Sequence, residues 1–150
     1  MALTVFCDTS VLVPALLENH IHYLSTFPLI DKIVQKKIEG VVSTHSLAEC
    51  FSTLTKLRDL PPMSPREAAQ VIDGSVRKFF RVVDSKEADY DNAIQLMAEK
   101  NLKGSLIYDA LILQIAARNK VSRVVTWDEQ DFSRLAPAGI QIVTPLFFEK

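Results

Sequence analysis

The chain has 150 residues, of which 48% are hydrophobic and 23% charged, and its formal net charge at pH 7 is −1. This length is enough to bury a hydrophobic core, so we expect one domain over residues 1–150. A charge near zero gives no support to a stable binder of double-stranded DNA, which usually carries a clear basic excess. The longest uncharged segments are too polar or too short to cross a bilayer, and the N-terminus lacks the features of a secretory signal. We therefore expect a cytoplasmic protein with no membrane contact.

The hydrophobic pattern alternates between strands and helices along the chain. Short runs of β-favouring residues predict strands over residues 3–7, 41–43, 79–83, 123–127 and 140–144. Helical spacing predicts helices over residues 11–18, 25–38, 46–57, 86–99 and 105–119. Gly40 is expected to stop the second helix. A further helix is expected to begin at Ser64, because Ser64-Pro-Arg-Glu67 forms a capping box with proline at the first helical position.

Strand–helix alternation predicts an α/β fold with a central, mainly parallel sheet of four to five strands covered by helices on both faces. Sheets of this kind bind ligands at the carboxyl ends of their strands, near a point where the strand order reverses. Polar residues that follow the predicted strands are therefore the first candidates for a functional site.

Three carboxylates stand alone in uncharged segments. Asp8 is the only charged residue among the first 17, Glu49 the only one between Glu39 and Lys56, and Asp109 the only one between Lys103 and Arg118. An ionised carboxylate buried without a partner costs several kcal/mol or more, so it must be neutralised, paired or bound to a metal. If the fold brings these three together, a divalent cation is the simplest way to keep them ionised.

The predicted elements place these carboxylates and Asp128 where they can meet. Asp8 follows the first strand and Asp128 the fourth, while Glu49 lies in the helix after the second strand and Asp109 in the helix before the fourth. Each has a plainer alternative. Asp8 and Asp128 can be helix N-caps, Glu49 can face solvent, and Asp109 can pair with a buried arginine from elsewhere in the fold.

Histidine and cysteine residues show no spacing suited to zinc. His20 and His22 alternate near a helix end and are expected at the surface. Cys7 and Cys50 lie in apolar segments, which favours buried free thiols over a disulfide.

Four motifs together resemble a known family. They are Phe6-Cys-Asp-Thr-Ser-Val-Leu-Val13, Ser46-Leu-Ala-Glu49, Ile107-Tyr-Asp-Ala-Leu-Ile112 and Val125-Thr-Trp-Asp-Glu-Gln-Asp-Phe132. In this order and spacing they are similar to the motifs of PIN-domain nucleases, and most similar to VapC-type toxins of toxin–antitoxin pairs. Any one motif is weak, but the resemblance covers essentially the whole chain.

The resemblance implies the roles of particular residues. Asp8, Glu49 and Asp109 would be the core acidic residues of a metal site. The fourth position would be Asp128, which sits at the strand end, with Asp131 as the substitute. Thr9 and Ser10 would hold the acidic side chains or a bound water by hydrogen bonds.

The donor set and the resemblance together predict a reaction. Hard oxygen donors without thiolate or imidazole select Mg²⁺ or Mn²⁺, and no Ser/His/Asp or Cys/His nucleophile is apparent, so a metal-activated water is the expected attacker. The resemblance implies an endoribonuclease that cleaves RNA phosphodiester bonds, forms a homodimer and is inhibited by an antitoxin protein. Asp8, Glu49, Asp109 and Asp128 would be catalytic through the metal.

Two other functions are compatible with this fold class. The first is a catalytically silent PIN-like module that binds RNA or protein, and the complete set of acidic positions argues against it. The second is a phospho-accepting domain with Asp8 as the nucleophile. It is weakened because residue 10 is serine rather than a second aspartate, and because no lysine follows a late strand to clamp a phosphate.

Overall fold

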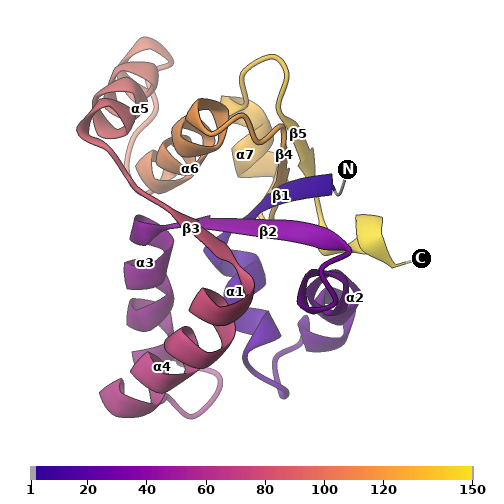
Figure 1. Ribbon diagram of the computed structural model, residues 1–150. Coiled ribbons are helices and arrows are strands. Elements are labelled where there is room, and N and C mark those ends of the chain that lie inside the picture. The colour runs from indigo at the N-terminus through magenta and orange to yellow at the C-terminus, as the bar shows by residue number, and fades with distance from the viewer. Residues whose placement is uncertain (1–2, 150) are drawn as a thin grey trace.

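One parallel sheet organises the computed structural model, which describes residues 3–149 (Figure 1). Within that range the sheet has five strands in the order β3-β2-β1-β4-β5, all parallel. The strands are β1 Leu3–Cys7, β2 Ile38–Ser43, β3 Arg81–Val83, β4 Arg123–Val125 and β5 Gln141–Val143. The predicted α/β class and the parallel sheet are confirmed.

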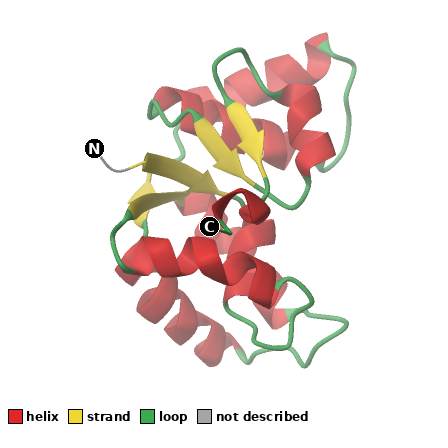
Figure 2. Cartoon of the chain, turned by 90° about the vertical axis from the view of Figure 1, so that its right-hand side faces the viewer, coloured by secondary structure: helices red, strands yellow, loops and turns green. Residues whose placement is uncertain are grey.

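Helices cover both faces of the sheet (Figures 1 and 2). They are α1 Thr9–Ala15, α2 Tyr23–Val34, α3 Thr44–Thr55, α4 Pro65–Val71, α5 Glu87–Glu99, α6 Leu106–Arg118 and α7 Glu129–Leu135. A π-helical segment, Ile72–Arg77, continues α4, and a 3₁₀ turn, Pro145–Phe148, follows β5. None of the helices in residues 3–149 is both long and apolar enough to cross a membrane.

The two faces of the sheet bury separate cores, because successive side chains of a strand point to opposite faces. Val5 and Cys7 of β1 pack with α1 to α4 in one core. Phe6 packs with α5, α6 and α7 in the other. Cys7 and Cys50 are both buried free thiols, as predicted.

The strand order reverses beside β1, because the chain moves from β1 to β2 and β3 on one side and later to β4 and β5 on the other. The backbone N–H of Asp8 donates to the carbonyl of Val125 at 3.0 Å, which joins the carboxyl ends of β1 and β4. Asp8 therefore lies at the topological switch point, where open α/β sheets bind their ligands.

The prediction that residues 25–38 form one helix is wrong at its C-terminal end. Helix α2 ends at Val34, and Ile38 already begins β2. Gly40 does not stop a helix but lies within β2, where a Cβ atom would come within 2.7 Å of the Phe80 ring and 2.9 Å of Ile33 Cδ1. Close packing of the sheet against these two side chains, rather than helix termination, requires glycine here.

Two other boundaries follow from local chemistry. The Ser64 hydroxyl accepts a hydrogen bond from the backbone N–H of Glu67 at 3.1 Å, so the predicted helix start at this serine is confirmed. The strand predicted over residues 79–83 begins only at Arg81, because the backbone N–H of Phe80 still bonds to the carbonyl of Val76 in a helical turn.

Candidate active site

Asp8 is held at the end of β1 by three hydrogen bonds. Its carboxylate accepts from the backbone N–H of Thr9 at 2.8 Å, from the Ser10 hydroxyl at 2.8 Å and from the Thr126 hydroxyl at 2.9 Å. The side chain is also the N-cap of helix α1, which is the simpler role considered for Asp8 in the sequence. The residue is only 5% exposed. Burial raises the pKa of Asp8 and the charge of Asp128 adds to this, whereas the three hydrogen bonds act in the opposite direction.

The same hydroxyls connect Asp8 to the end of β4. Ser10 Oγ accepts from the backbone N–H of Trp127 at 3.0 Å, and Thr126 Oγ1 accepts from the backbone N–H of Asp128 at 2.9 Å. The expected role of Ser10 toward Asp8 is thus present in the structure. The expected role of Thr9 toward Asp8 is also present, through its backbone N–H, while the Thr9 hydroxyl has no hydrogen-bond partner among the described residues.

Glu49 lies in α3, one turn after His45, and its side chain is partly buried. Its Oε1 atom is buried without a hydrogen bond, and the 3.4 Å approach of His45 Nε2 does not have hydrogen-bond geometry. Burial, and then the charge of Asp8, raise the pKa of Glu49 to about 7. A buried acceptor of this kind is suited to a cation.

Asp109 lies in the first turn of α6, and every charge that shifts its pKa is negative. Burial, followed by the charges of Asp8, Asp128, Asp131 and Glu49, raises the pKa of Asp109 to about 7. An arginine partner would lower this pKa, so the alternative of a buried ion pair is wrong for Asp109.

Asp128 and Asp131 both belong to the acidic cluster, in different ways. Asp128 raises the pKa of Asp8 and of Asp109, whereas Asp131 acts on Asp109 alone. Asp128 occupies the N-cap position of α7, but its side chain makes no capping hydrogen bond and remains available. Both residues line a hollow of about 400 Å³. The choice of Asp128 as the fourth acidic residue therefore stays a prediction.

The chemistry of the cluster fits a hard divalent cation. In residues 3–149 no group of three or more His, Cys, Asp or Glu side chains is already placed to hold a metal ion. The carboxylates nevertheless raise one another's pKa, and Glu49 presents a buried oxygen without a partner. A set of oxygen donors with uncompensated negative charge suits Mg²⁺ or Mn²⁺.

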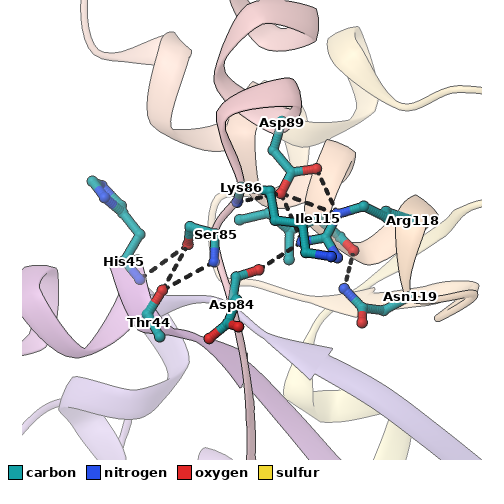
Figure 3. A network of polar contacts seen from close by, with 9 residues as sticks. All are labelled: Thr44, His45, Asp84, Ser85, Lys86, Asp89, Ile115, Arg118 and Asn119. Carbon is teal, nitrogen blue, oxygen red and sulfur yellow. Dashed lines mark hydrogen bonds and ion pairs between the residues drawn. The ribbon is translucent and has the colours of Figure 1, made fainter.

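A polar network ties together the helices that carry Glu49 and Asp109 (Figure 3). Ser85, before α5, bonds to the Thr44 side chain and to the backbone N–H of His45 at the start of α3. Arg118, the last residue of α6, donates to the Asp89 carboxylate and to the carbonyl of Asp84. The β3–α5 connection therefore fixes α3 and α6 relative to each other.

The sequence pattern did not identify three residues at this site. Thr126 binds Asp8, Trp127 stacks on His22 with ring centroids 4.2 Å apart, and His45 stacks on Tyr108 at 5.6 Å. His20 and His22, which were predicted at the surface, are partly exposed and line a hollow there. The four-residue spacing of His45 and Glu49 was a local signal of their proximity.

The fold and this arrangement of carboxylates define a class of protein. The family model described as "PIN domain" matches residues 5–137, and the chain belongs to the PIN-domain family. The resemblance seen in the motifs is thereby confirmed.

Particular relatives are VapC proteins. Ribonuclease VapC27 of Mycobacterium tuberculosis (strain ATCC 25618 / H37Rv) is 26% identical over 137 residues, which are 91% of this chain and 93% of that protein. The crystal structure of M. tuberculosis VapC20, a sarcin–ricin loop cleaving toxin, has a TM-score of 0.68 at 16% identity and covers 91% of this chain and 98% of its own. DNA-bound VapBC from Salmonella typhimurium has a TM-score of 0.66 at 21% identity and covers 95% of this chain and 98% of that chain. The two structural similarities concern the fold alone.

Proposed function

We propose that this protein is an Mg²⁺- or Mn²⁺-dependent endoribonuclease and the toxin of a toxin–antitoxin pair. The observation that carries the proposal is the electrostatic environment of Asp109 in this PIN domain: among the described residues, the charges that shift its pKa are those of four other carboxylates, and none is basic. The similarity to a ribonuclease and to a toxin that cleaves the sarcin–ricin loop supports RNA as the substrate.

The acidic residues of the chain would bind the cation, and their neighbours would orient them. Asp8, oriented by Ser10 and Thr126, would hold the cation together with Glu49, Asp109 and Asp128. A bound Mg²⁺ or Mn²⁺ supplies an activated water and stabilises charge on the phosphoryl oxygens. Glu49 and Asp109 each have a pKa of about 7, so both must lose their protons to act as ligands, and metal affinity should rise with pH.

The structure argues against the phospho-accepting alternative. Three hydrogen bonds and burial hold the Asp8 carboxylate, whereas a nucleophile must be free to approach a phosphorus atom in line. The catalytically silent alternative differs from our proposal only in activity, so it is an outcome of the test below.

The test is cleavage of a structured RNA by the purified protein with Mg²⁺, with Mn²⁺ and with EDTA. We expect cleavage only with metal, and we expect Asp109→Asn to reduce it at least about 100-fold, because the substitution removes one charge from the cation site while keeping the side-chain shape. Asp91→Asn is the matched control, since Asp91 is exposed on α5, and it should cleave like the wild type. Undiminished cleavage by Asp109→Asn would contradict the proposal, and no cleavage by the wild type would favour a silent module.

We further propose a cytoplasmic homodimer that binds an antitoxin. The similarity to the VapBC complex supports a protein partner. Leu24 and Phe27 in the first turns of α2, and Ile21 two residues before the helix, expose large apolar side chains, which monomeric proteins rarely gather on one surface.

A further inference from the structure

A second hollow adjoins the acidic cluster and is built differently from it. It has a volume of about 370 Å³, within the range of about 300–1,000 Å³ usual for small-molecule sites. Trp127 and Asp128 line both this hollow and the acidic one, so the two meet at these residues. A ligand in the second hollow would therefore lie beside Asp128 and beside Ser10, whose hydroxyl donates to the Asp8 carboxylate.

Aromatic rings held in fixed positions form part of its wall. His22 stacks on Trp127 with ring centroids 4.2 Å apart and an interplanar angle of 14°. The Trp127 indole N–H donates to Thr26 Oγ1 at 3.2 Å, and His20 Nδ1 accepts from the backbone N–H of His22 at 3.0 Å. These bonds settle the ring orientations before any ligand arrives, which reduces the entropy lost on binding.

The polar groups of the hollow favour an uncharged ligand. Among residues 3–149 its lining includes no lysine or arginine, and the one charged residue is Asp128, so a phosphate would be repelled there. The hydroxyls of Thr9 and Thr53 contribute to the lining, and the buried Thr9 Oγ1 lacks a hydrogen-bond partner. A flat, neutral ring with hydrogen-bonding edges matches such a wall, and aromatic side chains are the usual stacking partners of unpaired bases.

We propose that the hollow formed by Thr9, His20, His22, Thr53 and Trp127 is a nucleobase subsite, which holds one unpaired base of the RNA next to the phosphodiester bond that is cleaved. This inference rests on the proposed ribonuclease function and adds a specificity site to it. The base packs against the rings, and its edge meets the hydroxyls.

Trp127 makes a direct test available, because it is the only tryptophan in the chain. We expect adenosine, guanosine, cytidine or uridine, added in EDTA, to change its fluorescence saturably, and ribose 5-phosphate to have no effect. His22→Ala should weaken nucleoside binding by about fivefold or more, the lower limit for losing one base–aromatic stack. The matched control is Phe147→Ala, which removes an exposed ring that does not line the hollow and should bind like the wild type.

Cleavage kinetics separate this subsite from the catalytic proposal. His22→Ala should raise KM for RNA with little change in kcat. If no nucleoside changes the fluorescence while the wild type cleaves RNA, the subsite is wrong and the ribonuclease function stands. If nucleosides bind but RNA is not cleaved with metal, the subsite stands and the proposed activity is wrong. An equal response to ribose 5-phosphate would overturn the assignment to a base.

Discussion

Burial and neighbouring negative charges raise the pKa of both Asp8 and Asp109, but the hydrogen bonds that the two carboxylates receive differ. Asp8 receives three hydrogen bonds, which favour its ionised form against the cost of burial. Asp109 is affected by burial and by four negative neighbours, and its pKa is raised to about 7. Without metal, Asp109 and Glu49, whose pKa is also raised to about 7, are therefore residues at which the cluster relieves its charge by binding protons.

This raised pKa predicts a pH dependence of stability in the metal-free protein. A carboxyl whose pKa is higher in the folded than in the unfolded state stabilises the fold below its ordinary pKa, about 4, and this contribution is lost as the pH rises through about 7. Glu49 acts in the same direction. In EDTA, the melting temperature should fall between pH 5 and pH 8, and it should fall less for Asp109→Asn. An unchanged slope in this variant would contradict the assignment.

Metal binding should reverse this effect at pH 8. A ligand that binds only the folded state stabilises it by about 2.7 kcal/mol at a concentration 100 times its Kd. Thermal melts with and without Mg²⁺ or Mn²⁺ should show a clear rise for the wild type and little for Asp109→Asn, which itself should be no less stable than the metal-free wild type. If Asp109→Asn were strongly destabilised and the wild type did not respond to metal, Asp109 would have a structural role instead.

Among the elements, α3 and α6 carry Glu49 and Asp109, and the β3–α5 connection holds them together (Figure 3). Arg118 Nη2 lies 2.7 Å from Asp89 Oδ2, and the Asp89 side chain is almost fully buried. Burial alone would raise the pKa of Asp89, but hydrogen bonds from Arg118 and the backbone of Lys86, together with their positive charges, lower it. The pair therefore stabilises the fold above the ordinary pKa of aspartate, about 3.9, and this contribution is lost as the pH falls.

Removing Arg118 should destabilise the protein strongly at neutral pH. Arg118→Ala leaves the buried Asp89 without its cation, and such a loss costs roughly 3–5 kcal/mol. Arg77→Ala is the matched control, because Arg77 and its partner Asp73 are both exposed and a surface pair contributes at most about 1 kcal/mol. Urea unfolding of both variants measures the difference. Equal losses would show that the Arg118 pair does not hold these elements together.

At the scale of the whole molecule, an apolar surface surrounds the start of α2. Ile21 is 87% exposed and Leu24 81%, and Phe27 follows on the same side of the helix. Leaving such side chains in water forgoes about 25 cal/mol for each Å² of apolar area that a partner would cover. This surface is consistent with the predicted contacts in a homodimer and with an antitoxin. The mass of the protein without an antitoxin distinguishes these two uses of the surface.

Light scattering of the purified chain should give the mass of a dimer at tens of micromolar. Leu24→Lys should shift the mass toward that of a monomer, because it places a charge in the contact, whereas Ile94→Lys on the exposed face of α5 should not. A monomer for the wild type would contradict the homodimer, and a dimer unaffected by Leu24→Lys would place the interface elsewhere.

Local sequence determined the fold class and the acidic candidates. The hydrophobic periodicity predicts the alternation of strands and helices. Asp8, Glu49 and Asp109 stand out as site candidates because each is isolated among uncharged residues, and burying a charge is costly in any fold. The start of β2 could not be read in this way. Gly40 has the local character of a helix stop, and only its contact with Phe80, forty residues later, shows that it belongs to a strand.

Only the tertiary structure decided how the candidates are held and what lies beside them. The bond from Thr126 to Asp8 spans 118 residues, and the stack of His22 on Trp127 also joins residues far apart in the chain. The tertiary packing decides whether the charge of an arginine or those of four carboxylates shift the pKa of Asp109, because a pKa depends on neighbours in space and not in sequence. Hydrophobic periodicity assigns a residue to one face of a helix or strand, but the packing of the folded chain determines which residues lie against that face.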